Sequence, residues 1–180
     1  EKGDEILSYL NDFDKPVFLV PGNWDWIGDE NWEPLAENKF QKLIDKYQNI
    51  QNINREKIRL QHHEFIGYGP CSGPEVPQYE DEKPDEEEME ELRQEYREKR
   101  RELQKLFDKA ERSVIFLSHN VPNQTSLDEI DNPDSPADGR HYGSLIVKDL
   151  IEQKSPVLSI AGHIHEGYGK ENIEDTLAIN

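Results

Sequence analysis

Short apolar runs, each bounded by polar or turn residues, recur along the chain and predict buried strands. Four of them are brief and rich in β-branched or aromatic residues: Val17–Val20, Val114–Leu117, Val157–Ala161 and Leu177–Ile179. A weaker run, Phe65–Tyr68, follows a polar stretch that has room for one or two strands of a β-hairpin. We therefore expect these runs to form the strands of the fold.

Amphipathic segments between the runs predict helices near Asp4–Leu10, Leu35–Tyr47 and Ser144–Ile151. The most highly charged segment, residues 84–111, has apolar residues at helical spacing. Its acidic residues crowd the start and its basic residues the later part, which suits the helix dipole. A long helix that covers a sheet explains this pattern better than a partner-binding helix does. Strands that alternate with helices predict one α/β domain over residues 1–180.

Composition narrows the possible partners. The 180 residues include 39 acidic and 21 basic side chains, which gives a formal net charge of -18 and argues against long nucleic acids. A single cysteine excludes disulfides and thiolate metal sites within one chain. No apolar run approaches the roughly 20 residues of a membrane span, and the start of the chain lacks the pattern of a signal peptide. These features predict a cytoplasmic protein that acts away from membranes.

Polar side chains follow three of the predicted strands. The first strand leads into PGNWD with Asn23, the second into SHNVP with His119, and the third into GHIH with His163 and His165. In α/β sheets, ligands bind beyond the carboxyl ends of the strands. We therefore expect these four side chains to lie close together.

The residue types of these motifs indicate a metal site. Neutral imidazole binds zinc, iron and related ions, and an amide oxygen adds a hard donor. On an extended segment, His163 and His165 would point the same way, because alternate side chains share a face. Each motif alone is also typical of an ordinary loop. The presence of all three at the ends of predicted strands favours a metal site. If the substrate is a phosphate ester, bound ions could supply the positive charge that this acidic protein lacks.

The three motifs resemble those of the calcineurin-like metallophosphoesterases, whose pattern runs D-x-H, G-D, G-N-H-[DE], a His within G-H or S-H, and G-H-x-H. The chain is most similar to the Icc-like branch, through SHNVP, HYGS (His141–Ser144) and GHIHEGYG, and also resembles the metallophosphoesterase-domain-containing proteins of animals. The resemblance implies a four-layer αββα sandwich, with two β-sheets flanked by helices. It also implies four metal ligands: Asn23, His119, His163 and His165.

The same resemblance implies a phosphoester hydrolase with two divalent metal ions, Mn²⁺ first and Fe, Zn, Ni or Mg as alternatives. A metal-activated water would attack a small phosphoester or phosphodiester, and a homo-oligomer is left open. Two other functions compete with this one. The first is a binding or regulatory module that keeps the fold without the chemistry. The second is a single structural zinc site formed by His119, His163 and His165.

The chain departs from the family pattern in two ways. The D-x-H and G-D motifs are absent, which predicts a fragment truncated at both ends that binds metal weakly and catalyses poorly. Trp24 replaces the histidine that usually contacts the phosphate, and indole cannot transfer a proton. Asp25, which usually orients that histidine, is then expected to be structural.

Three other polar residues are candidates for contact with the substrate. Arg140 and Asn120 are predicted to bind it. His141 is the candidate catalytic residue, because it could replace the missing acid. Its alternative role is that of a structural cap beside Gly143 and Ser144.

Overall fold

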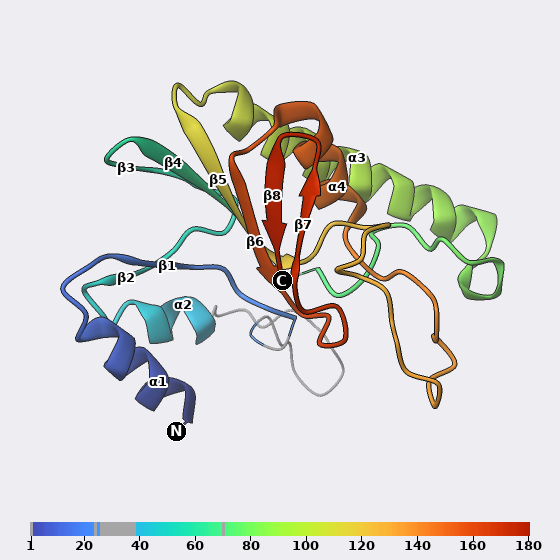
Figure 1. Ribbon diagram of the computed structural model, residues 1–180, viewed down its shortest axis with the longest axis horizontal. Coiled ribbons are helices and arrows are strands. Elements are labelled where there is room, and N and C mark those ends of the chain that lie inside the picture. Colours follow the sequence, from blue (N-terminus) through green and yellow to red (C-terminus); the bar gives the residue numbers. More distant parts are fainter. Residues whose placement is uncertain (1, 24, 26–38, 70) are drawn as a thin grey trace.

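Two β-sheets flanked by helices make up the fold, as Figure 1 shows. This computed structural model describes residues 2–23, 25, 39–69 and 71–180. The arrangement confirms the predicted α/β class and the layered order of helices, two sheets and helices.

The larger sheet has six strands in the order β3-β4-β5-β6-β8-β7. Their bounds are Lys57–Leu60 (β3), His63–Tyr68 (β4), Ser113–Asn120 (β5), Leu158–Gly162 (β6), Lys170–Ile173 (β7) and Thr176–Ile179 (β8). The four central strands are parallel, whereas β3 and β7 join the two edges as antiparallel strands. Parallel central strands bring the carboxyl ends of β5 and β6 to one edge of the sheet.

The smaller sheet pairs β1, Val17–Leu19, in parallel with β2, Ile50–Asn52. Helices α1, Lys2–Asn11, and α2, Lys39–Ile44, contact β2. The small sheet meets the larger one where the ring of Phe18 packs 4.9 Å from that of Phe65, centroid to centroid. This contact brings the end of β1 to the face of the larger sheet that carries the predicted site.

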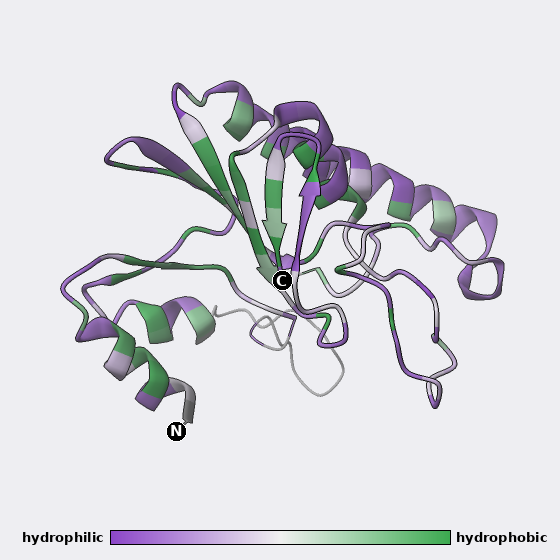
Figure 2. Cartoon of the chain, viewed as in Figure 1, coloured by the Kyte–Doolittle hydropathy of each residue, from purple (hydrophilic) through white to green (hydrophobic). Residues whose placement is uncertain are grey.

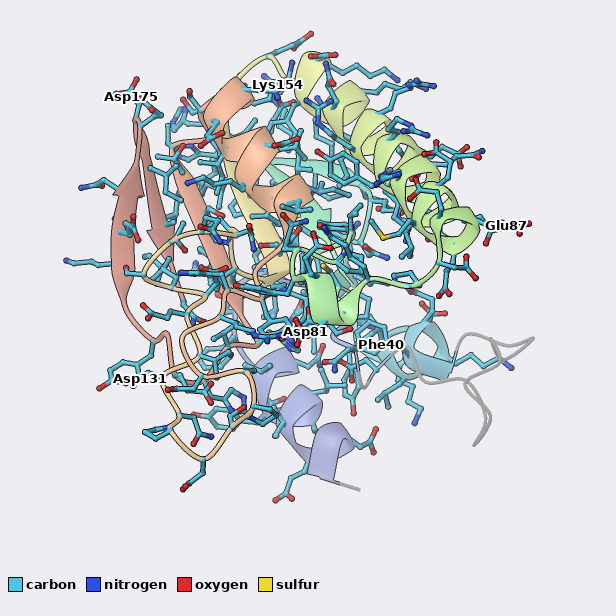
Figure 3. All side chains as sticks on the ribbon, turned by 90° about the vertical axis from the view of Figure 1, so that its right-hand side faces the viewer. Phe40, Asp81, Glu87, Asp131, Lys154 and Asp175 are labelled. Carbon is cyan, nitrogen blue, oxygen red and sulfur yellow. The ribbon has the colours of Figure 1, made fainter. Side chains whose placement is uncertain are left out.

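Helices α3, Glu86–Asp108, and α4, Leu145–Lys154, cover the other face of the larger sheet. The ring of Phe107 packs edge-on against Phe116 at 5.2 Å. Figure 2 shows α3 as mostly hydrophilic and the central strands as mostly hydrophobic. The acidic start of α3 faces solvent, where Figure 3 shows Glu87 pointing away from the sheet. The predicted covering helix is confirmed, and Asp85 caps it by accepting the N–H of Glu88.

Most observed elements follow the predicted ones, although the helix expected at 35–47 ends at Ile44 and α4 continues three residues past its predicted end. Three further differences concern the strands and a short helix. Strand β5 extends three residues further than predicted, so His119 lies within a strand and not after it. Strand β7 was not predicted, because its sequence KENI is polar, as an edge strand with one open side can be. The short 3₁₀ helix η1, Glu80–Glu82, was also not predicted. The start of the helix expected at 35–47 and the tryptophans at 24 and 26 lie outside the described residues.

No helix within the described ranges is long and apolar enough to cross a membrane.

Candidate metal centre

Two of the predicted histidines and the predicted asparagine lie together at the carboxyl edge of the sheets. Figure 1 shows the segment after β1 and the ends of β5 and β6 meeting there. The imidazoles of His119 and His163 are 4.6 Å apart, centroid to centroid, and nearly edge-to-face. Atom Oδ1 of Asn23 lies 2.9 Å from Nε2 of His119. Residues from three distant parts of the sequence therefore form one polar cluster.

Strand alternation explains why His119 belongs to this cluster. Along β5, Phe116 and Asn120 are buried on the helix-covered face, whereas Leu117 and His119 are half-buried on the opposite face. The imidazole therefore emerges on the side where β1 arrives.

A tight turn after β1 places Asn23 beside His119. The N–H of Gly22 donates to Oδ2 of Asp25 at 2.9 Å, and the N–H of Asp25 donates to the carbonyl of Gly22 at 3.2 Å. A Cβ atom on Gly22 would lie 2.9 Å from Cε1 of His119, so any larger residue would push the imidazole out of its present position. Asp25 closes the turn, which agrees with the structural role expected for it.

His163 occupies a strained backbone position. Strand β6 ends at Gly162, the φ of His163 is 78°, and the N–H of Ile164 donates to the carbonyl of Gly162 at 3.0 Å. These features match a γ-turn with a positive φ, a rare and strained conformation. The expected extended His-x-His segment is therefore wrong, because the backbone turns at His163. His165 follows on the exposed surface.

Both clustered imidazoles are biased toward the neutral form that binds metals. Burial, followed by the nearby charge of His163, lowers the pKa of His119 to about 4. Burial also lowers the pKa of His163, and the charge of His165 adds to this effect. His165 is therefore close enough to His163 to influence its pKa.

The donor chemistry of this cluster fits one side of a metal centre. The amide oxygen of Asn23 and the imidazole of His119 lie 2.9 Å apart, so both donors would be available to hold one ion from the same side. Where the structure describes the chain, however, no group of three or more His, Cys, Asp or Glu side chains is arranged to hold an ion. The metal-ligand assignment of Asn23, His119, His163 and His165 stays a prediction.

The two predicted substrate-binding residues, Asn120 and Arg140, both bind other groups of the protein, and their contact with a substrate stays a prediction. The Asn120 amide donates to the carbonyl of Tyr142 at 2.9 Å and accepts the N–H of Val121 at 2.8 Å, within the fully buried face of β5. This arrangement gives Asn120 a role in holding the loop that precedes α4.

Arg140 is held by two carboxylates. Its guanidinium binds Asp81 and Glu82 at 2.8 Å each, and it stacks 4.7 Å from the centre of the Tyr79 ring. These partners raise its pKa, with Asp81 contributing most. Arg140 thus ties η1 to the loop that precedes α4.

The candidate catalytic residue His141 is oriented by a buried carboxylate. Its Nδ1 lies 2.8 Å from Oδ1 of Asp128, whose side chain is fully buried. The other donors to Asp128 come from the same loop: Asn123 Nδ2 and the backbone N–H groups of Gln124, Thr125 and Gly143. A carboxylate with so many donors favours an Nδ1–H tautomer, which leaves Nε2 of His141 free to accept. Sequence reasoning missed this pair, because thirteen residues separate its members.

The single cysteine of the chain has a protonated thiol. The Cys71 thiol is buried and bonds to the carbonyl of Gly73 at 3.0 Å. Burial, followed by the charge of Glu75, raises its pKa to about 12. Because metals bind the thiolate and not the thiol, Cys71 is a poor ligand in this environment.

The chain belongs to the calcineurin-like phosphoesterase family, whose model matches residues 2–167. This match confirms the family named by the sequence motifs. The family generally uses divalent metal ions and hydrolyses phosphate esters.

Two solved structures share the fold at low sequence identity. One crystal structure has a TM-score of 0.65 and 20% identity, over 98% of this chain and 61% of its own. The crystal structure of TT1561 of Thermus thermophilus has a TM-score of 0.51 and 14% identity, over 98% of this chain and 67% of its own. The chain thus spans less than two thirds of the first structure. No curated protein matches closely enough to count as a relative.

Proposed function

We propose that this chain provides part of a metal-dependent phosphoester hydrolase that acts on small phosphoesters or phosphodiesters. The observation that supports this most is the convergence of Asn23, His119 and His163 from three separate segments. Family membership supplies the class of reaction, and the neutral imidazoles supply the donors that divalent metals need.

The residues have distinct roles in this proposal. Asn23 and His119 would bind one ion, and His163 and His165 would complete a binuclear centre. Bound divalent ions, with Mn²⁺ as the first choice, would polarise the phosphate oxygens and lower the pKa of a bound water. The Gly22–Asp25 turn keeps the amide of Asn23 against His119.

Metal titration with a matched histidine control tests this proposal. The 180-residue chain is titrated with Mn²⁺ by calorimetry, and hydrolysis of bis-p-nitrophenyl phosphate is measured with the same ion. We expect weak Mn²⁺ binding that His163→Ala reduces at least about tenfold, since losing even an outer-shell partner has that effect. His62→Ala, at an exposed histidine of the β3–β4 turn, should leave binding unchanged. Equal effects of the two variants would reject the site.

His141 is proposed as a proton carrier that Asp128 orients. The His141→Ala variant should lower the Mn²⁺-dependent rate about 10²–10⁴-fold without reducing Mn²⁺ affinity. Arg140→Ala is a useful comparison, because its contacts with Asp81 and Glu82 are structural and should affect stability more than rate. An unchanged rate in His141→Ala would leave this residue with a purely structural role.

A binding or regulatory module is the second candidate function. Within the residues that the structure describes, the cluster has two imidazoles and one amide but no group of three ionisable ligands. Such a module would bind Mn²⁺ or a phosphate ester through His119 and His163 with no metal-stimulated hydrolysis. Measurable turnover that His119→Ala abolishes would exclude it.

A further inference from the structure

The segment that follows β4 contacts the metal-site histidine. The backbone carbonyl of Ser72 lies 3.1 Å from Nε2 of His163. A carbonyl can only accept, so this contact requires the hydrogen on Nε2 and leaves the lone pair of the neutral ring on Nδ1. Histidines that bind metals commonly donate their second ring N–H to such an acceptor, which fixes the tautomer and the ring orientation.

One side chain, Glu75, anchors this segment to the rest of the domain. Its carboxylate accepts from four donors: Tyr68 Oη at 3.2 Å, the N–H groups of Leu145 at 2.8 Å and Ile146 at 3.3 Å, and the Ser144 hydroxyl. These donors belong to the end of β4 and the start of α4, and the Cys71 thiol of the segment itself lies 3.3 Å from the same carboxylate. Glu75 therefore binds residues 71–75 between the two elements.

Helix capping alone does not explain why Glu75 binds the start of α4. Ser144 is already the N-cap residue, and its hydroxyl accepts the N–H of Val147 at 3.1 Å. Glu75 is a second acceptor at the same helix end, and it comes from a segment 70 residues earlier in the chain. The negative carboxylate also suits the positive end of the helix dipole. Glu75 therefore fixes the position of the segment that contains Ser72.

We infer that Glu75 is a positioning residue for the metal site: it holds residues 71–75 so that the Ser72 carbonyl fixes the tautomer of His163, with Nδ1 free for a metal. The inference rests on the proposed function for the identity of the ligand. The tautomer itself can be measured without any metal. Failure of the positioning role can therefore be separated from failure of the proposed function.

The decisive measurement is the tautomer of His163 in the metal-free protein. Nitrogen-15 NMR of the imidazoles, at a pH where histidine is neutral and with signals assigned through His163→Gln, should show the hydrogen on Nε2 in the wild type. Glu75→Ala should produce a mixture of the two tautomers. The same variant should bind Mn²⁺ about 10–100-fold more weakly, as the loss of an outer-shell partner does.

A cap elsewhere in the fold provides the matched control. Asp85→Ala removes the N-cap of α3, so it should lower the melting temperature and leave His163 in its wild-type tautomer. Glu75→Gln keeps the size of the side chain and one acceptor oxygen, and it should shift the tautomer in the same direction by less. It serves as the second variant if Glu75→Ala does not fold.

The outcomes separate the two ideas. An unchanged His163 tautomer in folded Glu75→Ala or Glu75→Gln overturns the positioning role and makes Glu75 a helix cap only. A shifted tautomer supports the role. If the tautomer shifts while the wild type itself binds no Mn²⁺, the positioning role holds and the proposed function fails.

Discussion

The two faces of the six-stranded sheet differ in how they are covered. On one face, Phe116 and Ala178 are fully buried beneath α3 and α4. On the other, Leu117 and Leu177 are only half-buried, and Ile160 is 37% exposed. The first, which we call the covered face, holds the principal hydrophobic core. The second, the open face, carries the histidine cluster.

The covered face therefore contributes most of the stability of the fold, whereas the polar side chains of the candidate site lie on the open face. His119 and Asn120 are neighbours in sequence but point to opposite faces, so one joins the polar cluster and the other supports a buried loop. A residue on the open face can have a polar side chain that is accessible to a ligand, because the helices α3 and α4 pack against the opposite face. Substitutions on the two faces should therefore have different effects.

The largest expected effect is a core truncation on the covered face. Phe116→Ala should reduce the free energy of unfolding by about 3–5 kcal/mol, because it removes a fully buried ring that packs on Phe107. Urea denaturation monitored by circular dichroism gives this value.

Ile160→Ala is the control on the open face. This side chain is 37% exposed, so its truncation should cost roughly 1 kcal/mol or less. Equal losses in Phe116→Ala and Ile160→Ala would show that the two faces are packed alike.

The second-largest expected effect on stability concerns Glu64, a buried carboxylate on the covered face. The Lys57 ammonium, followed by the N–H groups of Glu111 and Arg112, lowers the pKa of Glu64. A lowered pKa in the folded state stabilises the fold above about pH 4.5, and this stabilisation is lost as the pH falls through the folded value. Glu64→Gln should cost about 1.5–3 kcal/mol at neutral pH and flatten the decline of stability in acid.

The comparison for Glu64→Gln is the same change at Glu56, an exposed residue. Urea denaturation at several pH values should show that Glu56→Gln leaves both the stability and its acid dependence nearly unchanged. If Glu64→Gln loses stability equally at neutral and acidic pH, the Lys57 pair is not the cause of the acid dependence.

The sequence predicts the layers of the fold because each depends on local patterning. The apolar runs at 17–20, 114–117, 157–161 and 177–179 all correspond to observed strands. The alternation of charge and apolar residues in 84–111 likewise identifies α3. These signals require only the periodicity of one segment at a time.

The sequence predicts the histidine cluster and its surroundings only in part, because the remainder depends on residues that are distant in the sequence. Asn23, His119 and His163 were found as residues that follow apolar runs. The partners of Arg140 and His141 lie 58 and 13 residues away, and no local pattern reveals such pairs. The turn at His163 was also missed, because neither Gly162 nor Ile164 signals a left-handed residue between them.

The smallest expected effect concerns this strained residue on the open face. A non-glycine residue in the left-handed region costs roughly 1–2 kcal/mol, which glycine avoids. Because His163→Gly and His163→Ala both remove the imidazole, the difference between them isolates the backbone. His163→Gly should be more stable by about 1 kcal/mol after glycine's own entropy cost is subtracted.

The same glycine–alanine comparison at two other positions tests whether strain is the cause. Ser155, which ends α4 with a φ of 46°, should also be more stable as glycine than as alanine. His165 is outside the left-handed region and should show the reverse order. If His163→Ala is more stable than His163→Gly, the γ-turn stores no strain. The histidine cluster on the open face would then not reduce the stability of the fold. If glycine is better, the chain retains a histidine at a measurable cost in stability, which is expected of a residue kept for binding and not for folding.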